Sequence, residues 1–224
     1  MLDYKIKTYE EAIEIVNEVG LLPLAPLFPD YPSLGSITDK ENWYTETEFD
    51  PWGWRTRFAA DGIAAYGKFV KKKSVLISRE LLPYIRTVLG NPMSVKDRYY
   101  NGMLSKYAFD LHSHILQEEG IDTRLLRAKA DMKAKEKKKA FDNGLLELQA
   151  SLDIVVSGTK EKQNAIGEKN GWNSTSYETI EHWTEKNKIE NIEIDREEVL
   201  QKLLQHFSVI SSPESMKKFQ KLFL

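Results

Sequence analysis

The chain has 224 residues, with 32 basic and 34 acidic side chains, a formal net charge of -2 and no cysteine. Disulfides, thiol nucleophiles and thiolate metal sites are therefore excluded, and the composition suits a reducing compartment. The bulk charge gives no argument for nucleic-acid binding, so such an argument must rest on local clustering. No stretch approaches the roughly 18 apolar residues of a membrane span, and the N-terminus lacks a signal-peptide pattern. We expect a cytoplasmic protein with one large domain or two small ones.

The first hundred residues predict an α/β region that begins with a helix. Thr8 and Glu11 have the spacing of a capping box, and Gly20 stands where a helix C-cap belongs. Residues 21–36 hold four prolines, so we expect a packed but irregular segment there. The further elements predicted in this region are a short helix over 61–69, a strand over 75–77 and a helix over 79–89.

The central segment has the order of elements of a winged helix-turn-helix domain. Apolar residues at helical spacing predict a helix over residues 105–120 and another over 133–152. Between them, a short helix is capped by Asp122 or Thr123. A strand over residues 153–158, a polar loop and a returning strand complete the order.

The C-terminal part is predicted to be helical. Its helices are expected over residues 176–186, 196–207 and 213–223, with a short strand or an extended linker over 189–195. The predicted fold class is α+β, mainly helical. The predicted domains are an N-terminal α/β region (1–100) with the tryptophan-rich segment, a winged-helix domain (101–175) and a C-terminal helical segment (176–224) packed on the rest.

Basic side chains gather at the start of the third predicted helix. Residues 124–139 contain eight basic and two acidic side chains. In a helix-turn-helix the recognition helix enters the major groove with its N-terminal residues near the base edges. Lysine is a point charge, which suits phosphate affinity more than base readout. We predict DNA contact here, with a solvated helix surface as the alternative. The predicted contact residues are Arg124, Arg127, Lys133, Lys135, Lys138 and Lys139.

Residues 43–58 concentrate three tryptophans. The favoured interpretation is a core or a domain interface. The alternative is a pocket that stacks a base or takes a ligand, since aromatic faces do both. That alternative rests on Trp52, Trp54 and Arg55.

The sequence predicts neither a metal site nor a cofactor. His112 and His114 are two residues apart on a helix, so they point in different directions, and His182 and His206 are isolated. No Walker or dinucleotide-binding glycine pattern occurs, and no serine has a nucleophile-elbow context. Residues 158–167, GTKEKQNAIG, are interpreted as the tip of the wing rather than a phosphate loop.

Five segments carry a resemblance to a known family. They are VGLLPLAPL, DPWGWRTRF, YGKFVKKKSVLISRELLPY, the block from SKYAFDLHSHILQEEG through LLELQASLDIVVSG, and, more weakly, GWNSTSYETIEHW. Over residues 4–185 the chain resembles the AlkZ/YcaQ-type winged-helix proteins, most of all the small AlkZ-related proteins. The resemblance implies a winged-helix fold and a link to DNA repair.

The resemblance also implies a departure from the family's chemistry. AlkZ-type enzymes are DNA glycosylases that excise alkylated or crosslinked bases, and their signature is a glutamine, one residue, then glutamine or aspartate after the first helix. The matching positions here hold Pro23 and Ala25, which cannot orient a water or accept a proton. We therefore expect a DNA-binding protein without this catalytic pair.

Two other functions stay open. The first is an active base-excision glycosylase with a relocated catalytic group, for which Asp30 and Asp50 are the candidates. The second is a protein-interaction or ligand-sensing module that uses the tryptophan-rich segment as its pocket, because a winged helix by itself does not settle function.

Overall fold

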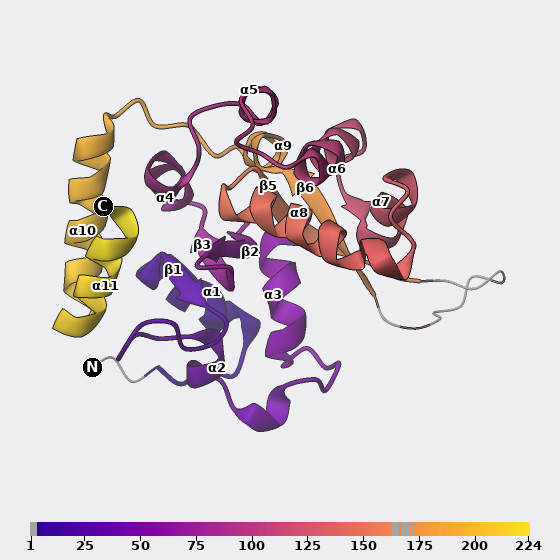
Figure 1. Ribbon diagram of the computed structural model, residues 1–224. Helices are drawn as coiled ribbons and strands as arrows, with labels where there is room; N and C mark the ends of the chain where they lie inside the picture. The colour runs from indigo at the N-terminus through magenta and orange to yellow at the C-terminus, as the bar shows by residue number, and fades with distance from the viewer. Residues whose placement is uncertain (1–3, 163–165, 167–170, 172) are drawn as a thin grey trace.

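A six-stranded antiparallel sheet runs through the computed structural model, which describes residues 4–162, 166, 171 and 173–224. Its strands lie in the order β1-β3-β2-β5-β6-β4, with helices around them (Figure 1). With the eleven α-helices of the described ranges, the sheet confirms the predicted α+β class. None of these helices has the length and apolar composition that crossing a membrane requires. The strands are β1 (Leu21–Pro23), β2 (Ala64–Val70), β3 (Lys73–Ser78), β4 (Ile121–Asp122), β5 (Ile154–Lys160) and β6 (Ser174–Thr179).

The first helix, α1 (Tyr9–Val19), forms where the capping box predicts it. The Thr8 hydroxyl accepts a hydrogen bond from the Glu11 amide, and the Glu11 carboxylate accepts one from the Thr8 amide. Gly20 ends the helix with a positive φ of 71°. Strand β1 follows at the edge of the sheet, where Pro23 is tolerated because an edge strand needs fewer amide donors.

Residues 64–70 form a strand, which corrects the helix predicted over residues 61–69. β2 lies between β3 and β5, and six of its seven residues are buried. A strand that is covered on both faces shows no alternation of apolar and polar residues, so this sequence lacks the signal of a half-exposed strand. Strand β3 confirms the strand predicted over residues 75–77.

Helix α3 (Pro51–Ala60) covers the second half of the tryptophan-rich segment, where the sequence pattern predicts no helix. Asp50 caps it, because its carboxylate accepts a hydrogen bond from the Trp52 amide at 2.9 Å. Pro51 occupies the first helical position, where an amide hydrogen has no partner in the helix. Of the other helices before residue 101, α4 (Leu82–Leu89) confirms the helix predicted over 79–89, whereas α2 (Leu34–Ile37) and α5 (Val95–Tyr100) are additional.

Gly20 is a position where a positive φ and a close neighbour both disfavour a side chain. An added Cβ would lie 2.6 Å from Leu81 Cδ2, on a backbone with a φ of +71°. Gly20→Ala should therefore lower the free energy of unfolding by about 1–3 kcal/mol. Gly53, inside α3, is the matched control: no atom lies within 4 Å of an added Cβ, so Gly53→Ala should raise stability by up to about 1 kcal/mol. Urea denaturation measures both changes, and equal stability of the two variants would contradict the geometry at Gly20.

The central segment follows the predicted order of helices. They are α6 (Lys106–Gln117), α7 (Thr123–Lys129) and α8 (Lys138–Ala150). Asp122 is the N-cap of α7, and its carboxylate accepts a hydrogen bond from the Arg124 amide at 2.9 Å. α8 begins later than the predicted residue 133, because a 3-10 turn over Lys135–Lys137 comes first.

Strands β5 and β6 join the central segment to the sheet. They pair with each other, with Ile154 opposite Thr179, and β6 is the expected returning strand. The two-residue strand β4, which the sequence pattern does not predict, pairs with β6 on its other side. The predicted wing loop between β5 and β6 falls mainly on residues 163–165, 167–170 and 172, which lie outside the described residues.

The C-terminal segment is mainly helical. Helix α9 begins at Ile180, which corrects the helix predicted over residues 176–186, because residues 174–179 form strand β6. Threonine favours strands, but most of the residues in this segment are polar, so the sequence lacks the apolar run or alternation that indicates a buried strand. Residues 189–195 form the extended linker rather than a strand. The C-terminal helices are α9 (Ile180–Lys186), α10 (Arg196–Ile210) and α11 (Pro213–Phe223).

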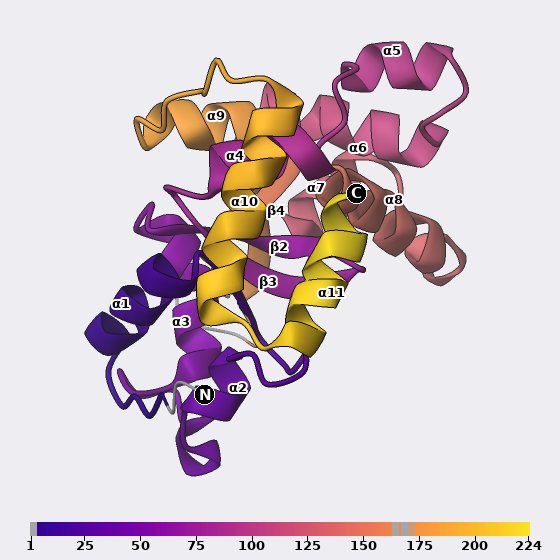
Figure 2. The ribbon, with the colours of Figure 1, turned by 90° about the vertical axis from the view of Figure 1, so that its left-hand side faces the viewer.

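The C-terminal helices α10 and α11 lie side by side and pack on the rest of the chain (Figure 2). Phe219 of α11 stacks on Phe207 of α10 and on Phe28 of the proline-rich segment, in each case with ring centroids 4.1 Å apart. The sheet crosses from the N-terminal to the central segment, since Tyr66 of β2 lies opposite Val156 of β5. One sheet and one hydrophobic core therefore connect the predicted segments.

Candidate nucleic-acid interface

The turn between α7 and α8 is held in place by Arg127. Its Nε donates to the Met132 carbonyl at 2.9 Å, and its Nη2 donates to the carbonyls of Lys133 and Ala134 at 3.3 and 3.4 Å. The guanidinium also lies 5.5 Å from the centroid of the Phe141 ring. Arg127 thus fixes where α8 begins relative to α7. Its contact with nucleic acid stays a prediction, since its donors here bind the chain's own carbonyls.

Four lysines that we predict to contact phosphates are exposed at the N-terminal end of α8. Lys133 and Lys135 precede the helix, and Lys138 and Lys139 are its first residues. Lys138 forms an ion pair with Asp142, whereas the other three make no ion pair within the described residues. We call these four residues the α8 lysine cluster. Most of its charge is not neutralised by protein carboxylates.

One face of α8 is turned to solvent and another is packed on α6. Lys139 and Asn143 are exposed on the first face. On the packed face, a Cβ added at Gly144 would lie 2.9 Å from Leu111 Cδ1 of α6. The small size of Gly144 therefore allows the two helices to approach closely. The lysine-bearing end of α8 lies beside α7 (Figure 1).

Arg124 connects α7 to the end of β5. Its Nη2 donates to the carbonyls of Lys160 and Glu161, both at 3.2 Å, and its Nε lies 3.3 Å from Asp122 Oδ1. These contacts place the first residues of the predicted wing beside α7. The predicted contact of Arg124 with nucleic acid stays untested, and its role within the chain is to position that loop.

The tryptophan-rich segment divides into core and surface residues. Trp54 and Phe58 are 3% and 0% exposed and pack against Tyr9, as the core interpretation predicts. Trp52, by contrast, is 36% exposed. Of the three residues proposed for a pocket, Trp54 thus belongs to the core, while Trp52 and Arg55 stay near the surface.

A cavity of about 490 Å³ lies between α3, α8 and the sheet, and we call it the α3–α8 cavity. Trp52 and Arg55 line it. Its other walls come from segments far apart in the sequence, among them Tyr66 of β2 and Asp142 and Gln149 of α8. The sequence pattern does not identify these last three residues. Of the three, only Gln149 could have been noticed in the sequence, because it is a polar residue on an otherwise apolar stripe of α8.

Two basic residues, Arg55 and Lys68, line the α3–α8 cavity, and Arg55 also makes the aromatic contact in its wall. The Arg55 guanidinium lies 3.4 Å from the centroid of the Trp52 ring and donates to the Trp52 carbonyl. The Tyr66 hydroxyl interacts with the same guanidinium. Burial lowers the pKa of Arg55, and no carboxylate among the described residues forms an ion pair with it.

The histidines do not gather with acidic residues into a metal-binding group within the described ranges. His112 lines a cavity of about 610 Å³ beside α6, and burial lowers its pKa. His182 Nδ1 lies 3.2 Å from Glu178 Oε2, and Lys186 pairs with the same carboxylate at 3.0 Å. These contacts connect β6 to α9, so His182, Lys186 and Glu178 have a structural role.

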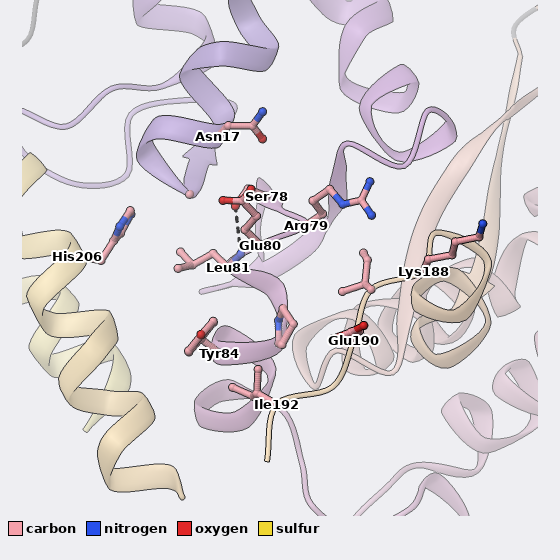
Figure 3. Close-up of a pocket in the computed structure, with 13 residues that line it drawn as sticks. Asn17, Ser78, Arg79, Glu80, Leu81, Tyr84, Lys188, Glu190, Ile192 and His206 are labelled. Carbon is pink, nitrogen blue, oxygen red and sulfur yellow. Dashed lines mark hydrogen bonds between the residues drawn. The ribbon is translucent and has the colours of Figure 1, made fainter. Parts of the chain in front are cut away.

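Another cavity, of about 560 Å³, lies where the C-terminal segment meets the N-terminal region (Figure 3). Asn17 of α1, Tyr84 of α4 and His206 of α10 line it. His206 Nε2 is 3.1 Å from the Val19 carbonyl, and Arg79 donates to the Asn187 carbonyl at 2.8 Å. Charges of both signs mix in its wall, so it favours no class of ligand. The charged lining residues are Arg79, Lys188, Glu80 and Glu190.

The positions that match the AlkZ-type catalytic pair carry no polar side chain. Pro23 is buried in β1, and Ala25 is exposed just after it. Asp30 is exposed in the same loop. The Asp50 carboxylate is buried and accepts three backbone amide hydrogen bonds of 2.9–3.1 Å at the start of α3. The capping of α3 therefore explains why Asp50 is buried at this position.

Comparison with known proteins places the chain in one family. The family model described as AlkZ related matches residues 6–224. No curated protein and no solved structure matches the chain significantly. Because the family match covers everything but the first five residues, the chain belongs to the AlkZ-related family.

Proposed function

We propose that this AlkZ-related protein binds duplex DNA through a winged-helix domain, with α8 as the recognition helix. The order α6-β4-α7-α8-β5-β6 supports this assignment, as does the pairing of β6 with both β4 and β5. In winged helices of this order, the third helix enters the major groove and the loop between the last two strands forms the wing.

The observation that carries the proposal is the exposure of the α8 lysine cluster. In a chain with a net charge of -2, four exposed lysines stand at the end of the helix that would meet the groove. Ammonium groups that are not paired within the protein can pair with phosphates and release counterions. Lysine lacks the planar fork that reads guanine, so we expect affinity with little sequence preference.

We also propose that the protein lacks the hydrolytic route of AlkZ-type glycosylases. A base-excising enzyme needs a polar group within hydrogen-bond reach of the attacking water. Pro23 and Ala25 provide none. A relocated catalytic group at Asp50 finds no support, because three backbone amides already engage that carboxylate. A strand-cleavage assay on alkylated duplex, developed with alkali, should show no abasic product.

Crosslinking tests which face of the protein meets DNA. The chain has no cysteine, so Asn143→Cys places a single thiol on the exposed face of α8. Coupled to benzophenone maleimide, this variant should crosslink to a 20-base-pair duplex on irradiation. The matched control is Gln220→Cys, because Gln220 is exposed on α11 at the other side of the molecule (Figure 1). This variant should not crosslink to the duplex. Equal crosslinking from both positions would contradict the proposed interface.

A further inference from the structure

The α3–α8 cavity adjoins the proposed DNA-binding face. Asp142, which lines the cavity, forms an ion pair with Lys138 of the α8 lysine cluster. The cavity therefore opens along the same helix, one turn beyond the lysines. A backbone held by these lysines would pass close to its mouth.

The walls of the cavity include planar side chains, namely a guanidinium and several aromatic rings. The Arg55 guanidinium lies on the Trp52 ring at 3.4 Å, and the Tyr44 ring contacts Trp52 at a tilt, with the two ring centroids 5.1 Å apart. Tyr66 and Tyr177 add two more rings to the wall. Nucleobases stack on aromatic rings and on guanidinium planes. A stack in which Trp52 supports Arg55 is thus suited to a planar ligand.

The polar groups of the cavity offer both donors and acceptors. Arg55 has no carboxylate partner in the described residues, so part of its donor capacity is available to a ligand. The Asp142 carboxylate, whose Oδ2 pairs with Lys138, is an acceptor in the same lining. The Gln149 amide, in contrast, is used by the chain, since it accepts from the Lys68 amide at 3.0 Å and donates to the Leu145 carbonyl at 3.1 Å. A base edge, with its own donors and acceptors, matches such a wall.

The geometry points to the α3–α8 cavity as a binding site for a nucleobase, stacked on Arg55 over Trp52. Its volume of about 490 Å³ falls within the range of roughly 300–1,000 Å³ that is usual for small-ligand sites. Because the inference rests on the proposed DNA binding, we expect the base to come from DNA, as an unpaired nucleotide next to the duplex held by α8. A free nucleotide has the same chemistry and is the other source.

The test compares two duplexes that differ in one nucleotide. One carries a bulged 2-aminopurine, and the other carries the same base paired with thymine. The protein should bind the bulged duplex about tenfold more tightly, which corresponds to about 1.4 kcal/mol of stacking. The fluorescence of the bulged base should fall on binding, whereas that of the paired base should not change.

Variants of the stack separate shape from charge. Trp52→Ala and Arg55→Lys should both lose the preference for the bulge and the loss of fluorescence, while the paired duplex binds as before. Arg55→Lys keeps the positive charge but removes the guanidinium plane. Loss of the preference for the bulged duplex in this variant therefore shows that the preference depends on stacking and not on charge. Tyr100→Ala, an aromatic residue that is 70% exposed on α5, is the control and should keep the preference.

The outcomes distinguish this inference from the proposed function. Equal binding of both duplexes, with no affinity for deoxynucleoside monophosphates, would overturn the nucleobase site and leave DNA binding intact. Equal binding with Trp52-dependent affinity for the monophosphates would support the site with a free nucleotide as its ligand. If neither duplex binds, the proposed function fails, and the monophosphates alone then decide the nucleobase site in the same way.

Discussion

Replacing Lys133, Lys135, Lys138 and Lys139 by alanine should weaken duplex binding about 100-fold at about 0.1 M salt. Each lysine that meets a phosphate releases condensed counterions, and four such contacts together have an effect of this order. The change also removes the partner of Asp142, which adds an unpaired negative charge to the same surface. Fluorescence anisotropy with a labelled duplex measures the dissociation constants.

The control for this variant keeps the same change of charge at another surface. Lys5, Lys7, Lys217 and Lys221 are exposed and belong to the N-terminal segment and α11, away from α8 (Figure 1). Their replacement by alanine should change the affinity less than about threefold, since charges beyond a Debye length of about 10 Å are screened. Both variants should keep the stability of the parent, because exposed substitutions of this kind usually change it by less than about 0.5 kcal/mol each.

Arg98→Ala should lower the free energy of unfolding by about 3–5 kcal/mol. Arg98 Nη2 lies 2.5 Å from Asp153 Oδ1, and the two side chains are 3% and 12% exposed. Without the guanidinium, the Asp153 carboxylate stays largely buried with the Ser151 hydroxyl, at 2.5 Å, as its side-chain donor. The ion pair also connects α5 to the residue before β5, so its loss affects the attachment of α5.

Urea denaturation followed by tryptophan fluorescence measures this effect. Lys106→Ala is the matched control, because Lys106 and Asp110 form an exposed ion pair, with side chains 69% and 39% exposed. Its loss should cost less than about 0.5 kcal/mol. A loss below about 1 kcal/mol for Arg98→Ala would show that the pair contributes no more than a surface contact.

Local signals predict the elements that depend on local chemistry. The capping box at Thr8 and Glu11 places α1, and the Asp122 cap places α7. The apolar stripes of α6, α8 and α10 are regular enough to show each helix. Their ends are less certain from sequence, as at α8, where Arg127 binds three carbonyls of the preceding turn and delays the helix.

Elements that depend on tertiary burial could not be predicted in the same way. β2 is covered on both faces, and β6 buries serines and threonines, so neither shows the alternation that identifies a strand. In α3, the cap at Asp50 and the following Pro51 are recognisable signals, but Gly53 and the tryptophans obscure the helical period.

The candidate site was predictable in one part only. A run of lysines in the sequence is enough to predict the α8 lysine cluster, because its members are neighbours in the chain. The α3–α8 cavity joins α3, β2 and α8, which come together through the pairing of β2 with β5 and the packing of α8 on β2. No local pattern records such contacts, so the sequence singles out Trp52 and Arg55 but also includes the buried Trp54.

The salt dependence of duplex binding tests the interaction between the α8 lysine cluster and phosphates most directly. Anisotropy titrations from 50 to 200 mM KCl give the slope of log K against log salt concentration for the parent and for the variant without these four lysines. We expect the slope of the variant to be less steep by about 3–4, at roughly 0.9 for each phosphate that the variant no longer neutralises. Identical slopes, or a parent protein that does not bind duplex at the lowest salt, would contradict phosphate binding by this cluster.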